Sequence, residues 1–223
     1  MPFCIAIDGP AGAGKSTVAK LLAQQLGYLY VDTGAMYRAV TLKALLRGVD
    51  LADEGALSDL TVSTRIDLTT GSNEITRVFL EREDVTSAIR APEVSRSVSI
   101  VARAPGVRAA LVDRQKRLAG LCDVVMEGRD VGTVVAPEAQ VKIFLTASVE
   151  ERARRRQADS TARGYQVSLE NTVEEIEERD RLDSSRLTAP LVPAPDARVI
   201  DCSRMNAQQV VELILELVRR SRG

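Results

Sequence analysis

Residues 9–16 read Gly9-Pro10-Ala11-Gly12-Ala13-Gly14-Lys15-Ser16 and match the pattern G-x-x-x-x-G-K-[ST] at every fixed position. A short apolar run, 3–7, comes directly before this stretch and is typical of a buried strand. After it, apolar residues recur at helical spacing, at Val18, Ala19, Leu21, Leu22 and Leu26. The sequence therefore predicts a strand, a glycine-rich loop and a helix in direct succession.

The loop has the composition of a phosphate cradle. Glycines let the backbone curl so that several N–H groups point at one phosphate, and the following helix adds its positive end. In this pattern the lysine reaches the β- and γ-phosphates, and the hydroxyl after it ligates Mg²⁺. We therefore predict that the chain binds a nucleoside triphosphate. The predicted contacts are Gly9, Pro10, Ala11, Gly12, Ala13, Gly14, Lys15, Ser16 and Thr17.

Composition excludes several function classes. The 223 residues carry 30 basic and 31 acidic side chains, so the net charge of −1 creates no overall field to attract nucleic acid or an anionic membrane. The absence of histidine excludes histidine-based acid–base chemistry and histidine metal sites. No apolar run approaches the ~20 residues of a membrane span, and we expect no signal peptide, because the first strand-like run is not preceded by a basic segment or a cleavage site. The three cysteines lie in or beside apolar runs, as reduced core thiols do, and we expect a cytoplasmic protein.

Strand-like and helical patterns alternate along the chain. The strand-like runs are 3–8, 28–32, 122–127, 141–146 and 198–202. The helical patterns are about 15–26, 35–47, 93–118 with an interruption at Pro105-Gly106, a segment that opens with the capping box Ser148-x-x-Glu151, and about 207–220. This alternation predicts an α/β domain, with a five-stranded parallel sheet, helices on both faces and ligands at the C-terminal ends of the strands.

One segment departs from the alternation. Residues 64–68, 75–81 and 84–89 have the pattern of short antiparallel strands, linked by turn-like residues at 70–73 and 81–83. They predict a small β insertion within 61–100. A decorative hairpin explains the same pattern equally well.

Polar side chains follow the second and third predicted strands, on the same rim as the glycine-rich loop. The hydroxyl of Thr33, the start of a helix and the guanidinium of Arg38 together suit a second phosphate. Glu127 closes the third strand and can hold Mg²⁺ through water. Arg129 and Asp130 add a donor and an acceptor beside it. A plain strand-to-helix turn and a surface ion pair are the alternatives.

A third candidate lies in the run 178–186. If a helix continues through it, Arg179, Asp183 and Arg186 share one face and can hold a ribose hydroxyl and a phosphate. Taken alone, this pattern fits a solvated ladder of ion pairs better.

Arginines also cluster after the fourth predicted strand. Arg152, Arg154, Arg155 and Arg156 precede the polar stretch 157–164, which we expect to be mobile. Arginines on a mobile flap close over a transferring phosphoryl group in many enzymes. An exposed helix without a ligand is the alternative.

Five segments, taken in order, resemble the bacterial cytidylate kinase family: 9–17, 32–38, 127–135, 141–145 and 189–193. The resemblance covers nearly the whole chain and includes the β insertion. It implies the fold of a P-loop nucleoside monophosphate kinase, with a single kinase domain over 1–223, an insertion at 61–100 that enlarges the monophosphate-binding domain, and a short lid at 150–165. It also implies transfer of the γ-phosphoryl group of ATP to CMP or dCMP, with Mg²⁺.

The resemblance further implies roles for individual residues. The catalytic set is Lys15, Arg129 and the lid arginines Arg152 and Arg156. The CMP phosphate is assigned to Thr33, Arg38, Arg129 and Arg186, the sugar hydroxyls to Arg179 and Asp183, cytosine to Ser99, Arg108 and Asp130, and the metal to Ser16 and, through water, Glu127. CMP and dCMP are the expected partners of a monomer that binds neither nucleic acid nor membrane.

Other functions remain as alternatives. Another small-substrate P-loop kinase, acting on UMP, AMP or shikimate, has the same loop. A nucleotide-dependent switch is less well matched, because the chain lacks the N-K-x-D guanine motif and its arginines suit a second phosphorylated ligand. A nucleic-acid-binding ATPase fits the balanced charge least well.

Overall fold

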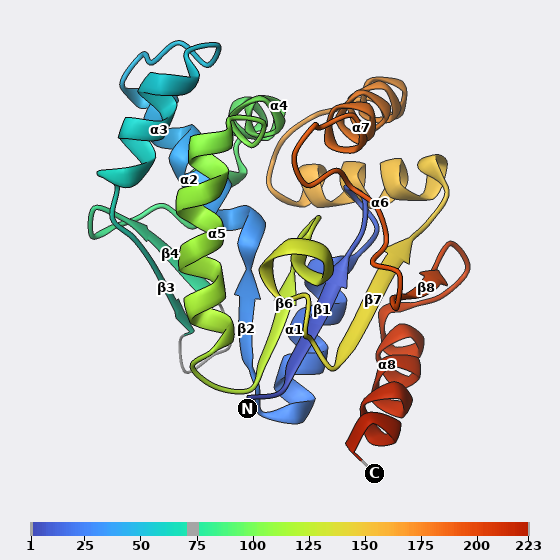
Figure 1. Cartoon of the computed structure of the whole chain (residues 1–223). Coiled ribbons are helices and arrows are strands. Elements are labelled where there is room, and N and C mark those ends of the chain that lie inside the picture. Colours follow the sequence, from blue (N-terminus) through green and yellow to red (C-terminus); the bar gives the residue numbers. More distant parts are fainter. Residues whose placement is uncertain (1, 71–75, 223) are drawn as a thin grey trace.

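The chain folds around a parallel β-sheet with the strand order β2-β6-β1-β7-β8 (Figure 1). The computed structural model describes residues 2–70 and 76–222. Neighbouring strands are parallel throughout the sheet. The strands are β1 (Cys4–Asp8), β2 (Leu29–Asp32), β6 (Val124–Glu127), β7 (Val141–Thr146) and β8 (Arg198–Asp201). The predicted five-stranded parallel sheet is therefore confirmed.

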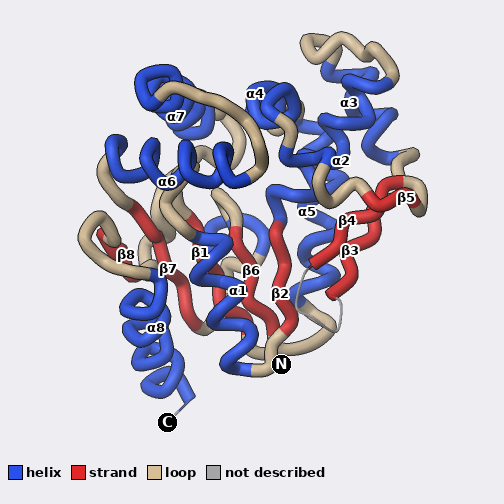
Figure 2. The backbone as a smooth tube through the Cα atoms, turned by 180° about the vertical axis from the view of Figure 1, so that it is seen from behind, coloured by secondary structure: helices blue, strands red, loops and turns tan. Residues whose placement is uncertain are grey.

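Helices cover both faces of this sheet, as predicted. They are α1 (Lys15–Leu26), α2 (Thr33–Leu46), α3 (Glu54–Val62), α4 (Pro92–Val101), α5 (Pro105–Ala119), α6 (Val149–Ala162), α7 (Leu169–Ser184) and α8 (Ala207–Arg222), with short helical turns η1 (Ala88–Arg90) and η2 (Val131–Val135). Because side chains alternate along a strand, Ile5 and Ile7 of β1 pack on α1 and α8, while Cys4 and Ala6 face η2 and α5. Figure 2 shows α1 and α8 in front of the sheet, and Figure 1 shows α5 on the opposite face.

A small antiparallel sheet lies beside α2. Its strands are β3 (Ile66–Thr70), β4 (Thr76–Leu80) and β5 (Glu83–Asp84). Val78 and Leu80 of β4 are buried against Ala35 and Ala39 of α2, so the sheet and the helix share a core. The predicted antiparallel insertion is confirmed, although most of the predicted turn at 70–73 and the start of the strand at 75 lie outside the described residues.

The predicted strand over 84–89 is wrong. β5 ends at Asp84, and Ala88–Arg90 form a turn of 3₁₀ helix. The Asp84 carboxylate accepts hydrogen bonds from the amide and the hydroxyl of Thr86, whose hydroxyl in turn accepts from the amide of Val78. Past β5, a backbone bond remains, from the amide of Val85 to the oxygen of Val78, and these side-chain bonds replace the rest of the ladder that a longer strand would form.

The predicted helical pattern over 93–118, with its interruption at Pro105-Gly106, is confirmed: α4 ends at Val101 and α5 begins at Pro105. Ala104 is extended before Pro105, and the proline begins α5, where its missing N–H costs nothing. The helix through 178–186 ends at Ser184. The predicted polar flap over 157–164 is helical through Ala162. α3 was not predicted, and Asp53 caps it by accepting from the amide of Ala56.

Two further expectations concern the membrane and the cysteines. Among the described residues, no helix combines the length and the apolar character that crossing a bilayer requires. All three cysteines are free, and Cys4 and Cys202 are buried as expected. Cys122 is exposed, so its predicted place in the core is wrong.

Gly9 is the position at which the sheet constrains the glycine-rich loop most tightly. Its φ is +146°, and a Cβ there would lie 2.0 Å from the carbonyl oxygen of Leu145 at the end of β7. Gly48 also has a positive φ, +63°, but a Cβ there would meet nothing within 4 Å. A side chain would strain the backbone at both glycines, but only at Gly9 would its Cβ also clash with a neighbouring atom.

Gly9→Ala is therefore expected to lower the free energy of unfolding by clearly more than Gly48→Ala. Gly48→Ala is the control, because it introduces only the strain of a left-handed backbone, about 1–2 kcal/mol. Gly9→Ala also forces β7 and the loop apart. Chemical denaturation of both variants measures the difference. Equal losses would show that β7 does not constrain the loop.

Candidate nucleotide-binding site

The glycine-rich loop connects β1 to α1 and lies beneath α6. Gly12 has a φ of +77°, and a Cβ there would come within 2.8 Å of the backbone oxygen of Arg152 on α6. Gly14 caps α1 in a left-handed conformation. Lys15 is buried, and its Nζ donates to the carbonyl oxygen of Pro10 at 2.7 Å. Burial, followed by the positive charge of Arg129, lowers the pKa of Lys15, so an anion in the loop would stabilise the ammonium group.

The ends of β2 and β6 meet beside this loop. Strand pairing places Asp32 and Ile7 on either side of Glu127. The Glu127 carboxylate is buried and accepts from the hydroxyl of Tyr30 at 2.6 Å, while its backbone oxygen accepts from the hydroxyl of Thr33 at 2.7 Å. Burial, together with the charge of Asp32, raises the pKa of Glu127. A cation beside this carboxylate would offset both effects.

A large cavity of about 1470 Å³ opens along the rim of the sheet. It runs from the glycine-rich loop past Glu127 to α6 and α7. Predicted site residues that line it are Ala11, Gly12, Gly14, Lys15, Ser16, Thr17, Arg38, Ser99, Glu127, Arg129, Arg156 and Arg179. The remaining predicted residues of this region do not line the cavity but support the loop; they are Gly9, Pro10, Ala13 and Arg152.

A smaller cavity of about 60 Å³ adjoins the large one. The two share Ser99, Glu127, Arg129 and Arg179 in their walls. Predicted site residues that line the smaller cavity are Thr33, Ser99, Arg108, Glu127, Arg129, Asp130, Arg179, Asp183 and Arg186. The structure thus brings together predicted site residues that lie far apart in the sequence.

Asp183 lies at the centre of the smaller cavity's polar wall. Its side chain is fully buried and accepts from Arg129 Nε at 2.9 Å, from the hydroxyl of Ser99 at 3.1 Å and from Arg186, with Arg179 Nε at 3.9 Å. Burial favours the neutral acid, but the charges of the three arginines outweigh it and lower the pKa of Asp183 to about 2. The solvated ladder of ion pairs is therefore the wrong interpretation of this run.

Arg108 and Asp130 form a second buried ion pair in the same cavity. Arg129 pairs with Asp183 rather than with Asp130, so the alternative of an isolated surface pair at 129–130 is also wrong. Asp8 holds the start of the turn that follows these residues: its carboxylate accepts from the amides of Val131 and Gly132 at 2.8 and 2.7 Å. Asp8 was predicted only as the end of a strand, since no motif marks the distant amides that it binds.

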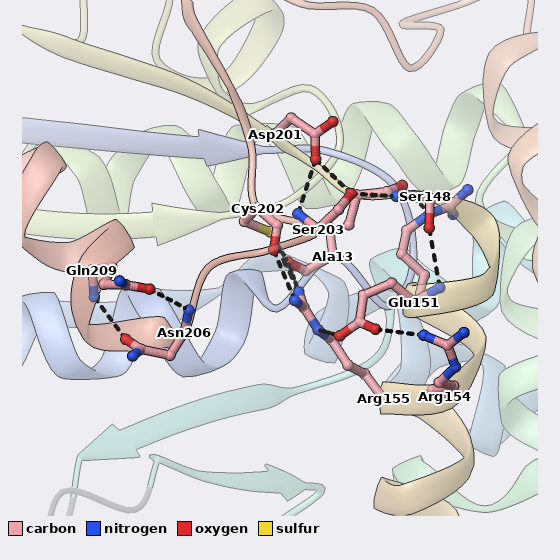
Figure 3. Close-up of polar contacts among 12 residues, drawn as sticks. Ala13, Ser148, Glu151, Arg154, Arg155, Asp201, Cys202, Ser203, Asn206 and Gln209 are labelled. Atoms are coloured by element: carbon pink, nitrogen blue, oxygen red, sulfur yellow. Dashed lines mark hydrogen bonds and ion pairs between the residues drawn. The ribbon is translucent and has the colours of Figure 1, made fainter.

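The four arginines of α6 have four different environments. Arg152 is buried and donates to the carbonyl oxygen of Ala11 at 3.1 Å and to Asp180 at 2.6 Å. Arg154 is exposed and pairs with Glu151. In Figure 3, Arg155 reaches from α6 to Cys202 and Ala13. Its Nη2 donates to the backbone oxygen of Cys202 at 2.8 Å.

Arg156 is the arginine of α6 that reaches across the large cavity. Its guanidinium donates to the hydroxyl of Ser95 on α4 at 3.0 Å, and Arg38 of α2 donates to the same hydroxyl at 2.9 Å. Arg90 pairs with Asp32 at 3.3 Å on the same wall. Ser95 and Arg90 were not predicted, because no motif surrounds them and only the fold brings them to the rim.

The cations of the large cavity lack enough carboxylates to balance them. Burial, followed by the charges of neighbouring arginines, lowers the pKa of Arg38 and of Arg179. Burial and the charge of Arg163 do the same for Arg156. Positive groups that lower one another's pKa in a buried site are stabilised by a bound anion. The geometry therefore suits a ligand, or a pair of ligands, with several phosphate groups.

Known proteins with similar sequences point to one family. Residues 5–220 match the family model described as cytidylate kinase. The cytidylate kinase of Pelotomaculum thermopropionicum is 59% identical over 98% of this chain and 96% of that protein. The cytidylate kinase of Bacillus licheniformis is 53% identical over 97% of this chain and 96% of that protein.

Solved structures are similar in fold. An uncharacterized protein from Eubacterium ventriosum has a TM-score of 0.56 at 10% identity, with 99% of both chains covered. A shikimate kinase from Bacteroides thetaiotaomicron has a TM-score of 0.50 at 13% identity, over 97% of this chain and 98% of that chain. Their low identities show the fold alone. The family match over nearly the whole chain and the closely similar relatives show that this chain belongs to the cytidylate kinase family.

Proposed function

We propose that this chain transfers the γ-phosphoryl group of ATP to CMP and dCMP, forming CDP or dCDP and ADP. The observation that carries the proposal is the pair of adjoining cavities that share Arg129 and Arg179, one along a phosphate loop and one around Arg108 and Asp130. Membership of the cytidylate kinase family supports the same reaction.

The donor half is the large cavity. The loop amides and Lys15 hold the β- and γ-phosphates of ATP, because the loop directs N–H groups and a buried ammonium at one position. Arg156 faces this cavity and closes on the transferring group, whereas Arg152 acts by fixing α6 to the loop through Ala11 and Asp180. This assignment divides the two predicted lid arginines into one that contacts the ligand and one that positions it.

The residues present also fit Mg²⁺. Ser16 and Glu127 both line the large cavity, and Mg²⁺ in such sites takes one or two protein oxygens together with substrate phosphates. No group of three His, Cys, Asp or Glu side chains that could hold a metal occurs within 2–70 and 76–222, which agrees with a metal held largely by its nucleotide. When bound, Mg²⁺ neutralises charge on the phosphates.

The acceptor half is the smaller cavity and its mouth. Thr33, Arg38, Arg129 and Arg186 hold the monophosphate, and Arg179 and Asp183 hold the sugar hydroxyls. Asp130 accepts from the exocyclic amine of cytosine while Arg108 donates to a ring acceptor. Uracil reverses part of this pattern, and leaving a buried polar group unpaired costs about 1–3 kcal/mol.

The chain's residues act in the transfer by placing charge. An oxygen of the acceptor monophosphate attacks the γ-phosphorus in line, a new P–O bond forms, and the bond to the β-phosphate oxygen breaks to release ADP. Lys15 and Arg129 stabilise the charge that moves onto the leaving and transferring oxygens. No general base is needed, because the attacking phosphate is already an anion at neutral pH, which agrees with a chain that has no histidine.

Further expectations accompany this function. The 61–100 segment is proposed to enlarge the monophosphate site and 150–165 to form the lid. Ser95, within the first segment, bonds to Arg156, within the second, so the two lie across one cavity. A monomeric state, a cytoplasmic location and the lack of a nucleic-acid partner stay predictions, the last of them supported by the balanced charge.

The direct test is ADP formation with ATP, Mg²⁺ and each of CMP, dCMP, UMP, AMP and GMP. We expect CMP and dCMP to give the highest kcat/KM, since cytosine offers the amine and ring acceptor that Asp130 and Arg108 match, whereas uracil lacks the amine. No stimulation by CMP would overturn the proposal. A clear preference for AMP or UMP would favour the alternative of another small-substrate kinase.

Lys15→Met should reduce kcat by about 10²- to 10³-fold, because it removes the buried cation from the phosphate loop without adding volume. Lys116→Met, on the exposed side of α5, is the matched control and should leave kcat unchanged. Circular dichroism checks that both variants fold. Near-normal turnover in a folded Lys15→Met protein would contradict the role given to this lysine.

Asp130→Asn should lower kcat/KM for CMP relative to UMP by at least about 10-fold, since the amide presents a donor where the carboxylate accepted. Steady-state kinetics with both acceptors give this ratio directly. An equal loss for CMP and UMP would mean that Asp130 supports the cavity wall and does not read the base.

A further inference from the structure

Tyr37 of α2 carries a buried hydroxyl that has no hydrogen-bond partner in the part of the chain that the structure describes. The residue is 7% exposed and lies one helical turn after Thr33. An unsatisfied buried hydroxyl destabilises a folded protein, and nearly all such groups in native structures are paired. The free protein therefore keeps a polar group in an unfavourable state.

Tyr37 forms part of the wall of the smaller cavity. Tyr37 lines it together with Arg108, Asp130, Val98 and Ala102. The Arg108 guanidinium lies 5.7 Å from the centre of the Tyr37 ring, and one of its terminal nitrogens is bonded to Asp130. The Nε of Arg108 is a second buried polar atom without a partner among the described residues.

The two unpaired atoms suit a flat, polar heterocycle. The apolar side chains of Val98 and Ala102 line the same cavity as the Arg108–Asp130 pair, so a ring can contact apolar atoms while its edge meets polar ones. Arg108 Nε can only donate, and it therefore requires an acceptor on that edge. Burial, partly opposed by the charge of Arg108, raises the pKa of Tyr37 to about 12, so its hydroxyl keeps the proton at neutral pH and is a donor too.

We propose that the Tyr37 hydroxyl donates a hydrogen bond to the pyrimidine base of the acceptor nucleotide, beside Arg108, and thereby helps to hold that base. This inference rests on the proposed function, because it takes CMP and dCMP as the ligands of the smaller cavity. It assigns Tyr37 to the base rather than the phosphate, since the Arg108 guanidinium lies beside its ring, while Arg38 and Lys15 do not line this cavity.

The proposal predicts two opposite effects of Tyr37→Phe. The variant keeps the ring and its contact with Arg108 but removes a hydroxyl that is unpaired in the free protein, so the free protein should be at least as stable as the wild type. Binding of the nucleotide should weaken, because the bond that the hydroxyl makes only with the base is lost. A residue that merely supports the cavity would lose stability and affinity together.

The experiment measures both quantities on the full chain. Calorimetric titration should show Tyr37→Phe binding CMP and dCMP about 3- to 10-fold more weakly than the wild type, with ATP affinity unchanged. Thermal unfolding without nucleotide should show no drop in Tm. Tyr30→Phe is the matched control: the Tyr30 hydroxyl is buried and paired with Glu127 at 2.6 Å, so its loss should lower the Tm of the free protein.

Each contrary result has its own meaning. Unchanged CMP affinity in Tyr37→Phe overturns the inference, and so does a lower Tm without nucleotide. Weaker binding of CMP with normal binding of dCMP also overturns it, because the hydroxyl would then contact the ribose 2′-hydroxyl. Wild-type protein that fails to phosphorylate CMP refutes the proposed function itself, a result that the activity assay gives independently of the variant.

Discussion

The buried carboxylate of Asp183 is the interaction on which both cavities depend. It holds Arg129 from the loop after β6, Arg186 from beyond α7 and the hydroxyl of Ser99 from α4, with Arg179 close by. A charge taken out of water is tolerated only with partners of opposite sign and satisfied hydrogen bonds. Here the partners outnumber the carboxylate, so the arginines are fixed in place while retaining positive charge for a ligand. The cluster therefore holds the arginines in position and leaves their positive charge only partly balanced.

Several backbone contacts transmit this organisation from the acceptor half to the donor half. The amides of Val131 and Gly132 bind Asp8, which directly precedes the phosphate loop, and the hydroxyl of Thr33 binds the backbone of Glu127. On the other side, Arg152 joins α6 to the loop and to α7. These bonds place the two proposed phosphate-binding regions on one rim of the sheet, which suits a reaction between two bound nucleotides, since the reacting groups must meet within a narrow range of geometry.

Predictions from the sequence succeeded where local rules decide the outcome. The phosphate loop followed from glycine and lysine spacing, the buried strands from their apolar runs, and the start of α6 from its capping box, in which Ser148 accepts from the amide of Glu151. They failed where a contact with a distant residue, or a competing hydrogen bond, decides the local structure. The strand predicted over 84–89 does not form, because Asp84 and Thr86 make side-chain hydrogen bonds instead. Cys122 is exposed although it lies beside an apolar run. The roles of Ser95 and Asp8 depend on partners more than 50 residues away, which no local pattern reveals.

By itself, the sequence determined the chemistry available to this protein: a phosphate loop, a set of arginines near the strand ends, no histidine base and a net charge of −1. It also determined the parallel sheet, because apolar strands alternating with helices have few other ways to bury both faces. Only the tertiary structure decided which charges pair and which remain free. Asp183 pairs with Arg129 across 54 residues, Arg108 with Asp130 across 22, and Tyr37 is left with none among the described residues. The physical reason is that pairing and burial depend on separation in space, and for residues far apart in the chain that separation exists only once the sheet has brought the loops to one rim.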